Sequence, residues 1–162
     1  MLTVPQLQAI KAEINADPAL SGQPNNSDGA FAIAAALNLP ANPAFIVWRT
    51  SVTQDEITQN GFTWTLVDAL SVGTARIWEW MFDNAERTIN PSKLNVRQGV
   101  IDVWSGTAGK LAVQAAVFAH CKRSASRVEK VLATGTGSDA TPAVMGFEGL
   151  ITYQEVEQAR AS

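Results

Sequence analysis

The chain has 162 residues, a length typical of one domain and sufficient to bury about 70% of the surface that the unfolded chain exposes. Hydrophobic residues make up 46% and charged residues 17%, so the surface must be polar without charge or partly covered by other subunits. A net charge of -3 and a pI near 5.1 give no general attraction to nucleic acid or to anionic membranes.

Cysteine content and hydropathy exclude further classes of protein. Cys121 is the only cysteine, which excludes an internal disulfide and a multi-cysteine metal site. The first residues lack a basic start followed by an apolar run, and no apolar stretch reaches the roughly 18 residues of a membrane span. We therefore expect a protein made in a reducing cytosol, with neither a secretory signal nor a membrane span.

Two helices are predicted before the first extended segment. Residues 4–17 place Ile10 and Ile14 on one helical face, with prolines near both ends. A second helix over residues 28–38 is rich in alanine, which allows a neighbouring helix to approach closely. Residues 44–52 favour either a short strand or a buried connection, because β-branched and aromatic residues predominate.

Three capping boxes mark further helix starts. In this motif a Ser or Thr side chain accepts a hydrogen bond from the backbone amide of a Glu, whose own carboxylate accepts one in return. The pairs are Thr53 with Glu56, Ser126 with Glu129, and Thr152 with Glu155. We expect a short helix to begin at each pair.

Apolar periodicity predicts the remaining helices. Residues 63–84 form one long helix or two consecutive helices, with a bend near Gly73. Helices are also expected around residues 96–104 and 107–122.

The C-terminal segment differs from the rest of the chain. No helical period survives between Gly135 and Gly149, and weak alternation there favours a β-hairpin or an extended arm. With six or seven helices and no linker-like stretch, the predicted fold is all-α, a single helical bundle over residues 1–134. Residues 135–162 are expected to form a Gly-rich C-terminal arm or hairpin and a short terminal helix of the same unit.

The glycines of this segment raise the question of phosphate binding. A P-loop requires a glycine, four residues and then Gly-Lys-Ser/Thr, and residues 104–111 lack both the first glycine and the hydroxyl residue. Gly135 and Gly137 follow a predicted helix and precede Pro142, whereas a dinucleotide fingerprint needs a strand before it and a helix after it. The pattern therefore predicts no phosphate site.

No residue pattern indicates catalysis. His120 and Cys121 are adjacent, and helix neighbours point about 100° apart, so they do not form a nucleophile and its base. We predict a buried cysteine beside a partly exposed histidine. Asp55 and Glu56 lie in the first turn of a helix, where the dipole favours negative charge. We expect no enzyme activity, no metal site and no cofactor.

A basic cluster and the tryptophans are the remaining candidates for binding. Arg123, Arg127 and Lys130 share a face if the chain between them is helical or makes a short turn. That face is either simply solvated or a site for an anionic partner.

The tryptophans divide by their predicted environment. Trp78 and Trp104 fall on apolar stripes and are expected in the core. Trp80 points away from Trp78 on the same helix and is expected to be exposed. Exposed tryptophan is enriched at protein interfaces.

Three stretches resemble a family of small virion proteins encoded in the head and neck gene modules of tailed bacteriophages. They are "FIVWRTSVTQDEI", "LNVRQGVIDVWSG" and "KRSASRVEKVLATGTGSDATPAVMGFEGLITYQEVEQAR". The similarity covers most of the chain, and the C-terminal block is its most specific part. The resemblance implies a head-to-tail adaptor, a helical subunit that forms a ring beneath the portal and extends its C-terminal arm along portal subunits.

The same resemblance implies the partners. They are further copies of the chain, as a ring of about a dozen on a twelve-fold portal, together with the portal protein and a downstream neck or tail protein. DNA would pass through the lumen without specific binding, which suits an acidic chain. The implied location is the head-to-tail junction of the virion.

The implied role has no catalytic residues, so the site residues are interface candidates. The arm contributes Gly135, Gly137, Pro142, Met145, Phe147 and Tyr153, and the basic cluster contributes Arg123, Arg127 and Lys130. Met145 and Phe147 are the expected anchors, so replacing both with Ser should spare the fold and abolish assembly.

Two alternative binding roles stay open, and an enzyme, which substitution of Cys121 and His120 would test, is a third class. A head-decoration or cement protein would use the same arm on capsid subunits. A DNA-binding packaging protein would instead use the basic cluster, and its affinity would fall steeply with salt.

Overall fold

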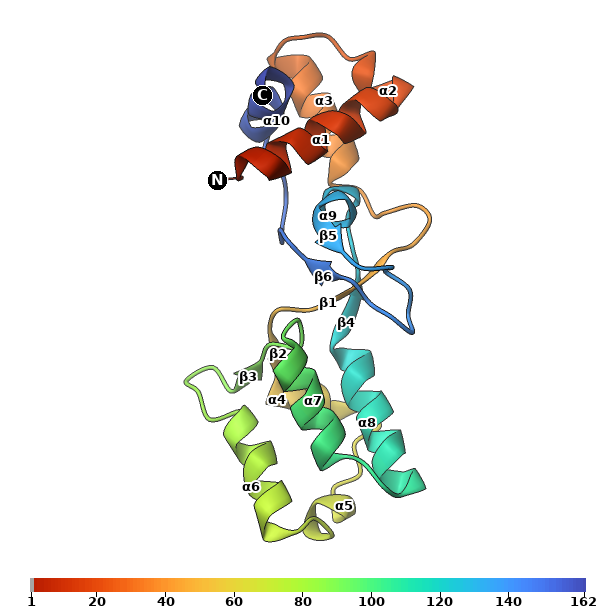
Figure 1. The fold of residues 1–162 in the computed structure, drawn as a ribbon, viewed down its shortest axis with the longest axis vertical. Coiled ribbons are helices and arrows are strands. Elements are labelled where there is room, and N and C mark those ends of the chain that lie inside the picture. The colour runs from red at the N-terminus through yellow and green to blue at the C-terminus, as the bar shows by residue number, and fades with distance from the viewer. Residues whose placement is uncertain (1) are drawn as a thin grey trace. The chain divides into compact units, whose positions relative to one another are not determined.

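The computed structural model describes residues 2–162. Over these residues the chain forms ten helices and six short strands (Figure 1). They belong to two compact units: unit 1 comprises the chain up to Val47 together with Ser124–Ser162, and unit 2 comprises Trp48–Arg123. The sequence instead predicts a bundle over residues 1–134 and an arm over residues 135–162, both in one unit.

The prediction of an all-α bundle is wrong. The chain is 53% helix and 11% strand, and the strands form three small antiparallel sheets, so the fold is mixed α/β. The pairs are β1 (Ile46–Trp48) with β4 (Lys122–Ser124), β2 (Val52–Thr53) with β3 (Thr88–Ile89), and β5 (Ala133–Thr134) with β6 (Val144–Met145). Strands of two or three residues are too short to show the alternation that reveals a strand in a sequence.

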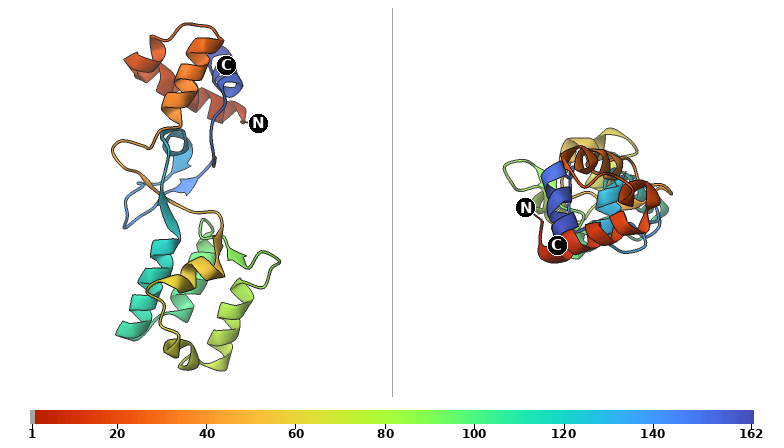
Figure 2. Two further views of the ribbon diagram at one scale, coloured as in Figure 1. Left: turned by 180° about the vertical axis from the view of Figure 1, so that it is seen from behind. Right: turned by 90° about the horizontal axis from the view of Figure 1, so that it is seen from above.

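Unit 1 is built mainly from helices that pack on one another (Figures 1 and 2). They are α1 (Val4–Ala16), α2 (Pro18–Ser21), α3 (Ser27–Leu37), α9 (Arg127–Leu132) and α10 (Tyr153–Ala161). Ile10 and Ile14 of α1 are buried as predicted, against Ile33 and Leu37 of α3 and Val156 of α10 in one apolar cluster. Each such side chain contributes about 1.5–3 kcal/mol when it leaves water.

Unit 2 surrounds an aromatic core. Its helices are α4 (Gln54–Gln59), α5 (Thr65–Asp68), α6 (Val72–Met81), α7 (Leu94–Val103) and α8 (Ala108–His120). The rings of Phe62, Trp78, Phe82 and Trp104 contact one another, with centroids 5.0 to 6.0 Å apart. The predicted burial of Trp78 and Trp104 is therefore confirmed.

The region from 63 to 84 contains two consecutive helices. The chain leaves α5 after Asp68, and Ser71 caps the start of α6 by accepting a hydrogen bond from the Thr74 amide at 3.2 Å. The interruption therefore lies just before Gly73, which itself sits within α6. Because a new N-cap begins α6, the chain stops and restarts its helix instead of bending one.

All three predicted capping boxes are present, at the starts of α4, α9 and α10. In the first, the Thr53 amide donates to the Glu56 carboxylate at 2.9 Å. This bond is the main reason that the pKa of Glu56 is lowered, and the Arg49 guanidinium, 2.8 Å away, adds to the effect. The structural role predicted for Glu56 follows from these contacts. A further box at Thr3 and Gln6 opens α1.

Candidate functional site

The C-terminal segment expected to form an arm lies against unit 1. Strand β6 pairs with β5, with Ala133 opposite Met145 and Thr134 opposite Val144. The Gly146 amide donates to the Leu132 carbonyl at 3.1 Å, and the Gln6 side chain donates to the Gly146 carbonyl at 2.8 Å. The segment is therefore a hairpin bonded to its own unit.

The two glycines of this hairpin serve its packing. Gly135 and Gly137 have positive φ angles of 124° and 67°, which favour glycine. A Cβ atom on Gly137 would lie 2.1 Å from the Phe45 ring, and one on Gly135 would lie 3.1 Å from the Cα atom of Ala143. The glycines therefore let the loop turn and close on neighbouring residues.

The predicted anchor side chains contact the interior of unit 1. Met145 packs against a buried cluster of Val47, Ala125 and Ala143. Phe147 and Tyr153 pack against the main core. Tyr153 also stacks on Phe31, with ring centroids 4.0 Å apart and planes at 24°. These residues stabilise the free chain, so replacing Met145 and Phe147 with Ser should weaken the fold.

The rest of the segment is more exposed. Pro142 is half-buried at the end of a polar turn in which the Ser138 hydroxyl accepts from the Thr141 amide at 3.0 Å. Leu150 is 71% exposed and is the one large apolar side chain of residues 135–153 that stands in solvent.

The structure divides the predicted basic cluster. Arg123 lies in strand β4 and is the last residue of unit 2, whereas Arg127 and Lys130 lie on helix α9 of unit 1. The expected shared helical face therefore contains only Arg127 and Lys130. The Lys130 ammonium stands 5.9 Å from the centre of the Phe45 ring.

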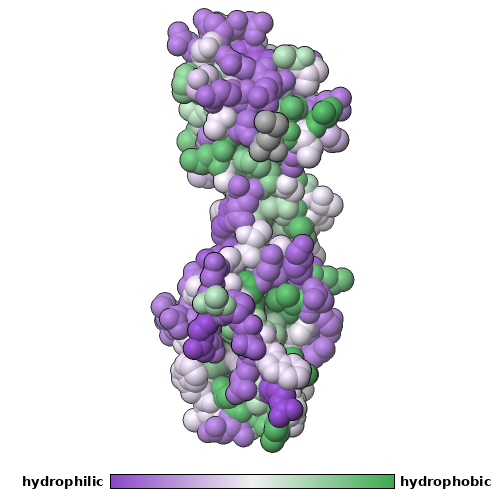
Figure 3. Space-filling model, turned by 90° about the vertical axis from the view of Figure 1, so that its left-hand side faces the viewer, coloured by the Kyte–Doolittle hydropathy of each residue, from purple (hydrophilic) through white to green (hydrophobic). Residues whose placement is uncertain are grey.

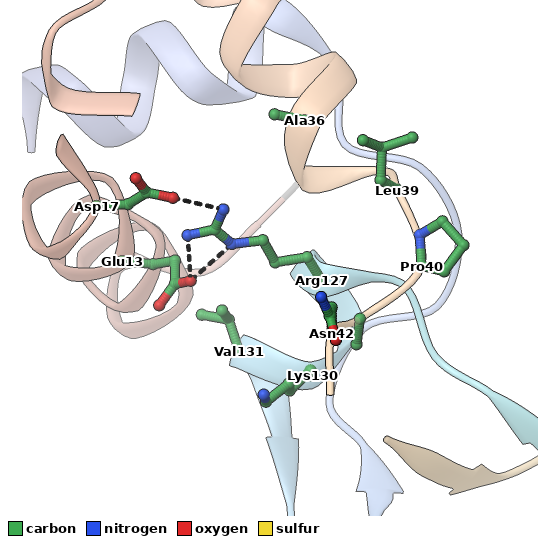
Figure 4. Close-up of a pocket in the computed structure, with 10 residues that line it drawn as sticks. Glu13, Asp17, Ala36, Leu39, Pro40, Asn42, Arg127, Lys130 and Val131 are labelled. Atoms are coloured by element: carbon green, nitrogen blue, oxygen red, sulfur yellow. Dashed lines mark hydrogen bonds and ion pairs between the residues drawn. The ribbon is translucent and has the colours of Figure 1, made fainter. Parts of the chain in front are cut away.

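Arg127 occupies a pocket of about 580 Å³ in unit 1 (Figure 4). Its guanidinium lies between two carboxylates, 2.7 Å from that of Glu13 in α1 and 2.7 Å from that of Asp17, the residue that follows α1. Lys130 lines the same pocket. The other lining residues are Ala36, Leu39, Pro40, Ala41, Asn42 and Val131.

The ion pairs set the charge state of this pocket. Burial opposes the charge on Arg127, but its bonds to Asp17 and Glu13 outweigh that effect, and its pKa is raised. The Arg127 side chain in turn lowers the pKa of Asp17, helped by a bond from the Ala19 amide. An anionic partner would have to displace two carboxylates from Arg127, so these ion pairs serve to join α1 to α9.

Cys121 and His120 make contacts that stabilise the fold. Cys121 is buried as predicted, and burial raises the pKa of its thiol to about 12. The His120 Nε2 atom lies 3.3 Å from the Asn60 carbonyl. No group of three or more His, Cys, Asp or Glu side chains suited to a metal ion occurs among residues 2–162.

An exposed apolar face on α6 was only partly foreseen from the sequence. Val72 and Trp80 are 80% and 65% exposed, and Ile77 is 44% exposed. Val72, Arg76 and Trp80 follow one another at intervals of four, so they lie on one side of the helix. Figure 3 shows apolar groups among hydrophilic ones on the side of the molecule that carries α6. Trp80 was expected to be exposed because it points away from Trp78, whereas no sequence signal singled out Val72.

The described helices and the wider comparisons add two findings. No helix in residues 2–162 has the length and hydropathy required to cross a bilayer. Comparison with protein-family models, with curated protein sequences and with solved structures gave no match in any of the three.

Proposed function

We propose that the chain is a structural virion protein of a tailed phage, a head-to-tail adaptor that assembles as a ring beneath the portal. The adaptor role is inferred from the sequence resemblance, which covers most of the chain. The observation that supports it physically is the set of large apolar side chains held in solvent on ordered helices, led by Val72, Trp80 and Leu94. Exposed apolar surface of this kind is typical of chains that bind other proteins.

The contact with the portal is proposed to use the outer side of the C-terminal hairpin. Met145 and Phe147 face the unit's own interior and are not free to serve as anchors. Leu150 and the polar turn over residues 136–142 are the exposed members of the segment. Weak contacts repeated around a ring add through effective concentration, so a small patch on each subunit is sufficient.

Of the alternatives, DNA binding receives the least support from the geometry. Arg127 is held by Glu13 and Asp17, and Lys130 lies over the Phe45 ring. A DNA-binding surface needs several cations that are free to contact phosphates.

The copy number in purified particles tests the proposal. Quantitative mass spectrometry should give this chain in a ratio near one to one with the portal protein. Hundreds of copies per particle would indicate a decoration protein, and absence from the particle would refute a virion role.

A variant pair tests the proposed portal contact. Leu150→Asp should reduce incorporation into particles while circular dichroism shows an unchanged fold. Leu39→Asp is the matched control, because Leu39 is a similarly exposed leucine of unit 1, at 61%, outside the segment. Equal incorporation of both variants would contradict a contact through Leu150.

A further inference from the structure

Helix α6 ends in an apolar and acidic surface. Trp80 lies with Glu79 and Asp83 around a pocket of about 470 Å³ at its C-terminal end. Both carboxylates are exposed, and within residues 2–162 neither forms an ion pair or a side-chain hydrogen bond. The last turn of the helix carries no basic residue, so the carboxylates add to the negative end of the helix dipole.

Two cations lie near this surface, and neither forms an ion pair with Glu79 or Asp83. The Arg76 guanidinium lies over the Trp80 ring, 5.9 Å from its centre. Arg87 also lines the pocket, and its guanidinium donates to the Gln54 side chain. The α6 end therefore combines an exposed indole with two carboxylates that lack a partner in the described chain.

Helix α7 begins with the complementary arrangement. Lys93 is its N-cap residue and makes no side-chain cap, and the first turn contains no acidic residue. Leu94 beside it is 72% exposed. A cation at the positive end of a helix is electrostatically unfavourable, as are carboxylates at the negative end. Departures from such local rules occur at functional sites.

We infer that the α6 end of one subunit binds the α7 start of a second copy of the chain. Leu94 would pack on the Trp80 indole, and the Lys93 ammonium would lie between the Glu79 and Asp83 carboxylates. This contact rests on the proposed function in one respect, since it names the surface through which the subunits of a ring would meet. It concerns unit 2 alone.

The charge pattern favours a second copy over an unrelated partner. The α6 surface offers two carboxylates without an ion pair in the described chain beside the exposed Trp80, and the α7 start offers an uncapped lysine beside the exposed Leu94. Two subunits can satisfy both surfaces, either reciprocally in a closed dimer or head to tail in a ring. Exposed charges are screened by salt, so the contact should weaken as ionic strength rises.

Charge exchange between the two surfaces provides the test. Sedimentation velocity of the full chain over a range of concentrations should show self-association that weakens at least tenfold with Glu79→Lys or with Lys93→Glu. The chain carrying both changes should regain part of the association, because the carboxylate introduced at position 93 then faces the ammonium introduced at position 79, while Asp83 still opposes it. That recovery also shows that the single variants did not fail by misfolding. Asp68→Lys, the same charge reversal at another exposed position of unit 2, should leave association unchanged.

The outcomes separate this contact from the ring itself. A closed dimer that depends on Glu79 and Lys93 supports the contact and contradicts the ring. A ring that is indifferent to both substitutions supports the ring and overturns the contact. A chain that stays monomeric up to its solubility limit, or double variants that do not recover, also overturn the contact.

Discussion

Gly137 offers a direct test of why the C-terminal hairpin is rich in glycine. In the structure a Cβ atom at this position would stand 2.1 Å from the Phe45 ring, well inside van der Waals contact. If the glycine served a partner or a ligand instead, Gly137→Ala would change binding and leave the fold intact. We expect the substitution to destabilise the isolated chain.

Two contributions set the expected magnitude. Alanine at φ 67° costs about 1–2 kcal/mol because its Cβ approaches the backbone. Displacing the Phe45 ring costs a further 1–3 kcal/mol or so, the usual effect of overpacking. The total of roughly 2–5 kcal/mol is a large fraction of the 5–15 kcal/mol or so that stabilises a typical domain.

A comparison in two backgrounds separates the contributions. With Phe45→Ala present, Gly137→Ala should cost only the backbone term, so its cost should fall by about 1–3 kcal/mol. Gly149→Ala is the matched control, because Gly149 also has a positive φ, 113°, but nothing lies within 4 Å of its Cβ position. Its cost should be the same in both backgrounds.

Urea unfolding followed by circular dichroism is the appropriate assay. All five tryptophans lie between Trp48 and Trp104 in unit 2, so their fluorescence does not report on unit 1, where the glycine lies. An equal cost of Gly137→Ala in both backgrounds would refute the steric explanation.

Three further predictions concern packing, titration and reactivity. Phe147→Ser should lower the free energy of unfolding by about 2 kcal/mol, half of the loss at a fully buried phenylalanine, as urea unfolding would show. Since Arg127 lowers the pKa of Asp17, the stability from this pair is complete above about pH 4 and lost as pH falls through the lowered pKa. Arg127→Gln should therefore flatten stability measured between pH 5 and 2. Cys121, with a pKa near 12, has a thiolate fraction at pH 8 roughly a thousandfold below that of a free cysteine, so iodoacetamide should label it only after unfolding.

Features that depend on a few neighbouring residues could be predicted from the sequence. In the capping boxes at Thr53, Ser126 and Thr152 the two bonded residues are only three positions apart. Both partners can therefore be recognised in one short stretch of sequence. Burial of Trp78 and Trp104 followed from helical periodicity in the same way.

Features set by distant residues could not be predicted in this way. Val52 pairs with Ile89, and nothing local to either residue identifies the other. The two strands have two residues each, so neither shows a period of its own. The division into units likewise depends on contacts between the chain's two ends, which enclose residues 48–123 in the sequence.

The candidate site shows the same limit. The residue types of Met145, Phe147 and Arg127 suit a binding surface. Met145 and Arg127, however, contact Val47 and Glu13, which lie about 100 residues earlier in the sequence, and Phe147 packs against the main core of unit 1. Whether an apolar or charged side chain is free to bind depends on what covers it, and that is a tertiary property.

The ion pairs of the two units decide which of the charges described above a partner can reach. In unit 1, Arg127 binds Glu13 and Asp17, and Arg160 donates to backbone carbonyls at 2.8 and 2.9 Å. In unit 2, by contrast, the carboxylates at the α6 end make no ion pair within residues 2–162. A contact through the α6 end of unit 2 should therefore weaken as salt screens these charges. Self-association that falls with rising salt is thus the first result expected of that contact, before any residue is changed.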